Sequence, residues 1–197
     1  MSVKRSTRKP WFRLSIAAGN LIQLAGLALG VGALLAASST PSALWAILEM
    51  GVGWMCLYLC CHAIAHWLIG RWVSIRFRYY TIDGTSKPQS WPPGPLRWLF
   101  ENIPFFRIHI DRTSLQNVSA GRQAAMWSAG VTASVVVPTL GAFWAWRLHL
   151  PGGLYLFIFT VIWSIGTVIN NLRAGGDYFK ARQVLTTAKP SVNVKSE

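Results

Sequence analysis

The chain has 197 residues, of which 52% are hydrophobic and 13% are charged. An ordinary soluble domain carries about 25% charged residues, so the composition excludes that class and indicates an integral membrane protein. Lysine and arginine outnumber aspartate and glutamate by 19 to 6, which gives a net charge of +13. Because these basic residues are spread over three segments, we expect them to meet water and anionic lipid headgroups, and we expect no nucleic-acid partner.

Four apolar segments are each long enough to cross a membrane, which takes roughly 20 helical residues. They cover residues 14–37, 43–72, 118–148 and 152–172. The first contains Gly26 and Gly30, a GxxxG pair that allows close helix packing. The sequence therefore predicts an all-α integral membrane protein with three parts. These are a basic arm at 1–13, a single four-helix domain at 14–175 and a basic tail at 176–197.

Positive charge predicts how the bundle is oriented. The arm, the loop 73–117 with its flanking helix ends, and the chain from Arg173 onward hold every lysine and arginine except Arg147. Because basic loops remain on the cytoplasmic side, we expect both termini and this central loop to be cytoplasmic. The location we expect is a bacterial inner membrane, with other membrane protein subunits as partners.

The central loop contains a predicted strand and a predicted surface helix. Residues 73–80 alternate apolar with polar or basic side chains, as a strand does, and a turn at Asp83-Gly84 follows. The proline-rich stretch 90–95 cannot form a regular element. Residues 96–106 are aromatic and basic, which predicts an interfacial helix with Trp98, Leu99 and Phe105 toward lipid. The alternative for that stretch is a loop packed over the helix ends.

His62 and His66 lie four residues apart in the second apolar segment, so both imidazoles share one helical face. The topology places Asp177, just beyond the fourth segment, at the same cytoplasmic end. One interpretation is a metal site formed by His62, His66 and Asp177. A second is a cofactor site in which His62 or His66 ligates haem or a chlorophyll-type pigment. A third is structural, with both histidines hydrogen-bonded to neighbouring helices.

The pentapeptide 62–66 (HAIAH) resembles the HExxH motif of the site-2 protease family of intramembrane zinc proteases. Residues 128–131 are similar to the small-residue Gly-Pro segment of that family, with Val131 in place of proline. The stretch 171–177 resembles its NLxPxxxxDG segment, whose aspartate is the third zinc ligand. The resemblance covers about residues 50–185. It implies zinc ligation by His62, His66 and Asp177.

Ala63 stands where the family carries the glutamate that activates the zinc-bound water. General-base assistance is typically worth about 100- to 10,000-fold in rate. The aspartate segment is also two residues shorter, lacks its proline and has Tyr178 in place of glycine. The resemblance therefore implies a noncatalytic relative that acts as a scaffold, regulatory or accessory subunit. The alternatives are an active metalloprotease with an unconventional base and a haem- or pigment-binding subunit of a bioenergetic complex.

Overall fold

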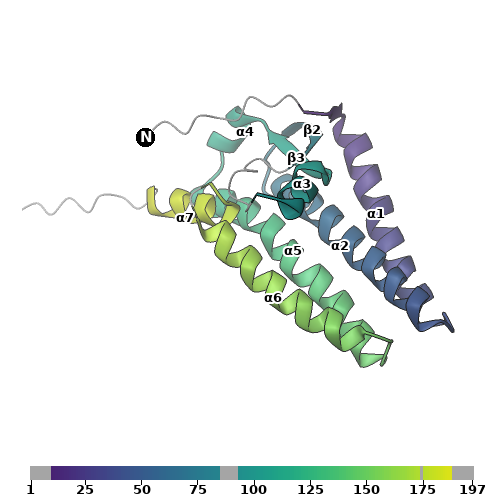
Figure 1. Ribbon diagram of the computed structural model, residues 1–197. Coiled ribbons are helices and arrows are strands. Elements are labelled where there is room, and N and C mark those ends of the chain that lie inside the picture. The colour runs from purple at the N-terminus through teal and green to yellow at the C-terminus, as the bar shows by residue number, and fades with distance from the viewer. Residues whose placement is uncertain (1–9, 85–92, 174, 188–197) are drawn as a thin grey trace, which may run out of the picture.

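The computed structural model describes residues 10–84, 93–173 and 175–187, which form four long helices with a small sheet at one end (Figure 1). The long helices are α1 (Ile16–Ala37), α2 (Ala43–Trp72), α5 (Ala120–Arg147) and α6 (Gly153–Leu172). Each is long and apolar enough to cross a membrane. The four predicted spans are confirmed as helices, with bounds within two residues of those expected.

Small residues bring the long helices together. α2 packs against α1 and α5, and α5 packs against α6. A Cβ added at Gly30 of α1 would lie 3.0 Å from the Gly53 carbonyl oxygen of α2, and a Cβ at Gly26 would meet the sulfur of Cys60. The predicted GxxxG pair therefore lies at the α1–α2 contact, where two backbones approach each other closely.

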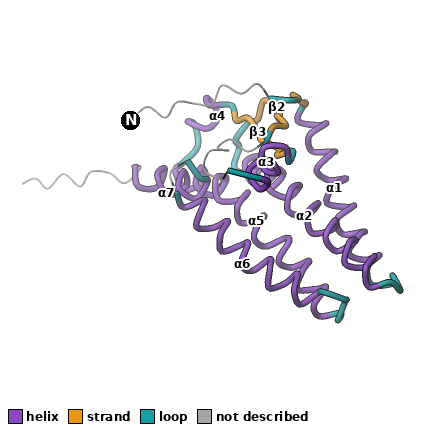
Figure 2. Tube along the Cα trace, viewed as in Figure 1, coloured by secondary structure: helices purple, strands orange, loops and turns teal. Residues whose placement is uncertain are grey.

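The sheet has three antiparallel strands in the order β1-β2-β3 (Figure 2). They are β1 (Phe12–Leu14), β2 (Phe77–Asp83) and β3 (Phe105–Ile110). The strand predicted at 73–80 thus begins four residues later than expected. The reason is that α2 ends in a turn, in which the Ile75 N–H donates to the Gly70 carbonyl at 2.7 Å and Ser74 has a φ of 71°.

Three further expectations for the central loop are wrong. The surface helix α3 (Pro95–Asn102) ends before residue 106, and Phe105 instead lies in β3, paired with Asp83. Phe105 pairs with β2 because the side chains of 105–110 point alternately to the two faces of the sheet, as they do in a strand. Trp98 is exposed, as expected. The Leu99 side chain and residues 90–92 of the proline-rich stretch lie outside the described residues. Pro95, which was expected to be irregular, is instead the first residue of α3, a position where a helix tolerates proline because that N–H has no partner within the helix. The short helix α4 (Arg112–Gln116) then leads to α5.

The basic arm and the basic tail both contribute regular structure. β1 lies at the end of the arm and pairs with β2. The tail begins with helix α7 (Asp177–Thr187), which packs against α5 and α6. In Figure 1 the sheet and α7 lie at the same end of the bundle. Tyr80 of β2 fixes the sheet there, since its ring packs on Gly19 and its hydroxyl donates to Asn20 Oδ1 at 2.7 Å.

Candidate metal centre

The structure brings His62, His66 and Asp177 together at the end of the bundle that carries the sheet. Helical spacing places both imidazoles on one face of α2, with ring centroids 4.8 Å apart. The Nε2 atoms of His62 and His66 lie 3.3 Å and 3.2 Å from the same Oδ2 of Asp177. Their ligand atoms all lie within 4.8 Å of one another. The three residues therefore form a possible metal-binding triad.

Hydrogen bonds fix the tautomer of each histidine. The Nδ1 of His66 lies 2.7 Å from the Met126 carbonyl oxygen, which can only accept, so Nδ1 carries the proton. The Nδ1 of His62 lies 3.0 Å from the Ser134 hydroxyl oxygen. That hydroxyl donates to the Gly130 carbonyl, so its oxygen accepts from His62. In both neutral imidazoles the Nε2 atom therefore presents a lone pair to Asp177.

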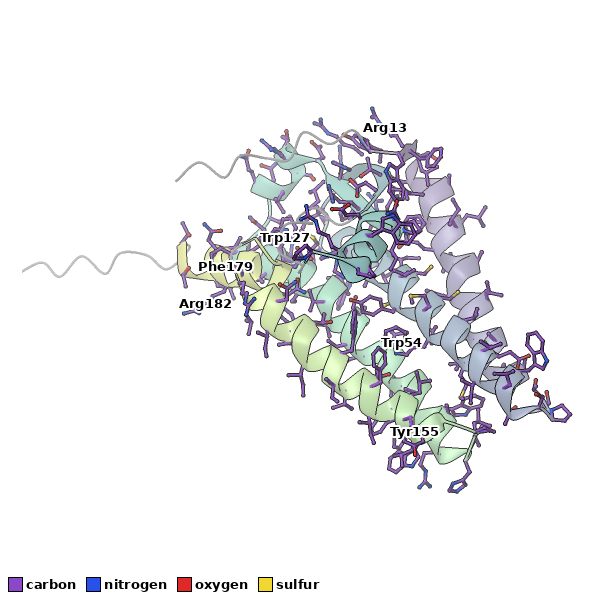
Figure 3. All side chains as sticks on the ribbon, in the orientation of Figure 1. Arg13, Trp54, Trp127, Tyr155, Phe179 and Arg182 are labelled. Carbon is purple, nitrogen blue, oxygen red and sulfur yellow. The ribbon has the colours of Figure 1, made fainter. Side chains whose placement is uncertain are left out.

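Asp177 is held from its other side by α7 and α5. The Lys180 ammonium donates to Asp177 Oδ1 at 2.7 Å and lies 4.5 Å from the centroid of the Trp127 ring. Figure 3 labels Trp127, which α5 contributes to its contact with α7. The Asp177 N–H donates to Asn171 Oδ1 at 3.3 Å. These contacts orient Oδ2 toward the histidines.

The Asp177 carboxyl is ionised. Burial raises its pKa, but hydrogen bonds from the Nε2 atoms of His62 and His66, when these carry protons, and the charge of Lys180 outweigh burial and hold the pKa well below the usual range. The carboxylate can then only accept hydrogen bonds. Three acceptor atoms consequently face one point, and such an arrangement is stable only when a cation or protons lie between them.

Packing determines how the triad is reached. The exposed fractions of the side chains are 6% for His66, 13% for Asp177 and 34% for His62. A Cβ added at Gly130 would collide with the His66 ring, so only glycine fits at that position of α5. The open side of the triad is therefore the side of His62.

An aromatic cluster separates the triad from the middle of the bundle. Trp54 stacks on Tyr58 with ring centroids 5.3 Å apart and meets Phe159 of α6 edge-on at 5.2 Å. Tyr58 lies one helical turn from His62 and also contacts Trp163 of α6. The cluster links α2 to α6 through these ring contacts.

The cysteines near the histidines do not belong to the triad. Cys60 points its sulfur at Gly26 of α1, and the Cys61 sulfur contacts the Tyr58 carbonyl oxygen at 3.6 Å. Among the described residues, the only cluster of possible ligands is therefore two imidazoles and one carboxylate.

Two imidazole nitrogens and one carboxylate oxygen are donors of the kind that bind divalent metal ions, zinc among them. Zinc binds imidazole nitrogen and carboxylate oxygen at about 2.0–2.2 Å with tetrahedral geometry, which places two ligand atoms about 3.3 Å apart. The Nε2 atoms of His62 and His66 lie 3.3 Å and 3.2 Å from Asp177 Oδ2, close to that value, and the three ligand atoms all lie within 4.8 Å of one another. The partners of both Nδ1 atoms supply the outer hydrogen bonds that ligating histidines require.

The sequence predicted the three ligands but not the residues around them. Nothing in the sequence singles out Ser134, and Lys180 is one of several basic residues of the tail. The i,i+3 spacing of Asp177 and Lys180 indicates an ion pair once the tail is recognised as a helix. The Met126 carbonyl is a backbone group, so no residue type signals its role.

No known protein family, curated protein or solved structure matches the chain. The function is therefore inferred from the chemistry of the triad.

Proposed function

We propose that this chain is a noncatalytic, site-2 protease-like membrane protein that holds zinc at His62, His66 and Asp177. It serves other membrane proteins as a scaffold, regulatory or accessory subunit, in a bacterial inner membrane with both termini in the cytoplasm. The observation that carries the proposal is the meeting of two imidazole lone pairs and one carboxylate oxygen at a single point.

A divalent ion satisfies this arrangement better than protons do. Without an ion, both Nε2 atoms must be protonated to face the Asp177 oxygen. Two such protons would place two positive imidazoles with ring centroids only 4.8 Å apart. Lys180 already places one positive charge on the same carboxylate. At neutral pH, zinc with both histidines neutral avoids these costs.

No carboxylate among the residues that the structure describes is placed to act as a base, which supports a noncatalytic role. A bound zinc ion supplies Lewis acidity and acidifies a water ligand, but a protease also needs a proton acceptor beside that water. Ala63 is 1% exposed and offers only a methyl group. The other described carboxylates are engaged elsewhere, by Thr40 or by arginines. They are Glu49, Asp83, Glu101 and Asp111.

The geometry favours an ion over haem or a pigment. A macrocycle needs a flat space beside the ligating nitrogen. The His66 ring is instead pressed against Gly130 and faces Asp177 across 3.2 Å. Both Nε2 atoms also point at one oxygen, an arrangement suited to a single small ion.

Metal content of the purified full-length chain tests the proposal. We expect about one zinc ion per wild-type chain, and none after His66→Ala. His149→Ala is the matched control, because His149 lies in the turn between α5 and α6. A visible absorption band from haem or pigment would contradict the zinc assignment, as would equal metal content in all three proteins.

Cleavage assays test the noncatalytic role separately. The zinc-loaded chain is incubated in lipid vesicles with a panel of single-span membrane peptides. We expect no cleavage above that of empty vesicles. Reproducible cleavage that disappears in His66→Ala would establish an active metalloprotease and overturn this part of the proposal.

A further inference from the structure

A second site lies where the end of α2 meets the beginning of α5. A pocket of about 290 Å³ is lined there by Trp72, Val73, Ser74 and Arg122. The Trp72 side chain is 82% exposed. Because both helices are candidate membrane spans, the pocket lies at the edge of the apolar part of the bundle. No member of the metal-binding triad lines it.

The pocket carries uncompensated positive charge. Arg122 lies in the first turn of α5, which contains no acidic residue, and Arg71 lies in the last turn of α2. Within the described ranges, no carboxylate pairs with either arginine. Four of the five described carboxylates are paired with other basic groups, and Glu49 is bonded to Thr40. The pocket therefore attracts an anion from outside the chain.

Ser74 is the second polar residue that lines the pocket. Its φ of 71° lies in the left-handed region, where glycine is the usual residue. The backbone N–H of Ser74 is already bonded to the Arg71 carbonyl at 3.1 Å. A serine at this position adds a hydroxyl group to the lining of the pocket, which a glycine would not do.

We propose that this pocket binds the phosphate of an anionic phospholipid. The Arg122 guanidinium pairs with the phosphate, the Ser74 hydroxyl donates to it, and the Trp72 indole lies beside the glycerol region. Arginine suits this ligand because its planar fork matches phosphate geometry. A lipid fits better than free phosphate because the exposed indole and the two helix ends belong at the headgroup level.

Native mass spectrometry of the full-length chain in detergent tests the proposal. The protein is titrated with dioleoyl phosphatidylglycerol or with the matching phosphatidylcholine, and retained lipids are counted. We expect preferential retention of phosphatidylglycerol, weakened about fivefold by Arg122→Gln, which is the effect of one basic residue near anionic lipid. Arg112→Gln is the control, since Arg112 is exposed on α4 and does not line the pocket.

The other outcomes are equally decisive. An equal loss of phosphatidylglycerol retention in Arg122→Gln and Arg112→Gln would show a diffuse attraction of lipid to the whole basic surface and would overturn the site. Equal retention of the two lipids, or displacement of phosphatidylglycerol by millimolar inorganic phosphate, would also overturn it. Ser74→Gly removes the hydroxyl group and also removes the strain of a side chain at a left-handed position. Weaker lipid retention with an undiminished unfolding temperature would therefore support the proposal. Zinc content should be unchanged in Arg122→Gln, which separates this test from that of the triad.

Discussion

At the level of single residues, the state of each histidine proton determines what the triad can hold. A hydrogen-bond acceptor beside Nδ1 keeps the proton on that nitrogen and leaves Nε2 free to bind an ion. For His66 the acceptor is a backbone carbonyl, and for His62 it is the Ser134 hydroxyl. A substitution can remove the Ser134 hydroxyl but not the backbone carbonyl.

Ser134→Ala should weaken zinc binding while leaving the fold intact. Loss of an outer hydrogen bond to a ligating histidine typically lowers metal affinity about 10- to 100-fold. Competition with a fluorescent zinc chelator measures the change. Ser128→Ala is the control on the same helix, because the Ser128 hydroxyl bonds only to the Ala125 carbonyl. Equal zinc affinity in wild type and Ser134→Ala would argue against ligation by His62.

Gly130→Ala should remove the metal by steric displacement. The added methyl group would collide with the His66 ring and force that ring away from Asp177. Gly121→Ala is the matched control on α5, since a Cβ there meets nothing within 4 Å. We expect elemental analysis to find zinc in Gly121→Ala and little in Gly130→Ala. Full occupancy in both variants would place the ion elsewhere.

At the level of elements, apolar length made the four long helices predictable. The elements that the sequence did not reveal depend on distant partners. β1 has three residues and exists because Phe12 and Leu14 pair with Ile82 and Tyr80. α7 is mostly polar and is held by contacts with α5, including that of Lys180 with Trp127. Local patterns do not report such long-range contacts.

The α1–α2 contact predicts how the bundle responds to added bulk. In Gly53→Ala the new methyl group would lie 2.9 Å from the Gly30 carbonyl oxygen, so the two helices must separate. Overpacking of this kind costs about 1–3 kcal/mol. Gly51→Ala has open space on the same helix and should be neutral or stabilising. Thermal unfolding in detergent measures both, and equal unfolding temperatures would contradict the close contact.

His109 on β3 is a titratable group in the sheet. Its ring stacks on Tyr79 at 4.4 Å, and its Nε2 lies 3.0 Å from the Thr81 hydroxyl. Burial lowers the pKa of His109, and the charges of Arg107 and Arg13 lower it further against the opposing effect of Asp83. Folding therefore favours the neutral imidazole.

The free energy of unfolding should consequently decrease as the pH falls. Above the unfolded pKa of about 6.5 His109 is neutral in both states and contributes no pH dependence. Below it the unfolded chain takes up the proton first, so stability declines until the lower folded pKa is passed. We expect His109→Gln to lose this part of the decline, measured between pH 8 and pH 5 with a chelator present. Parallel curves for the two proteins would show that His109 does not contribute.

At the level of the whole molecule, the triad depends on the path of the chain. His66 and Asp177 are 111 positions apart and meet because α5 lies between α2 and α7 and packs against both. The residue types and the number of spans were enough to predict that the three ligands lie at one end of the bundle. The shared oxygen of Asp177 and the placement of Lys180 follow from the α7 helix, which the sequence did not reveal.

X-ray absorption spectroscopy of the zinc-loaded, full-length chain tests the central claim most directly. We expect one zinc ion per chain, bound by imidazole nitrogen and carboxylate oxygen at about 2.0–2.2 Å. The imidazole signal should be lost in His66→Ala, which should retain no zinc. Sulfur ligands at about 2.3 Å would instead place the metal on the cysteines of α2. That result, or a wild-type chain that binds no zinc, would contradict the account.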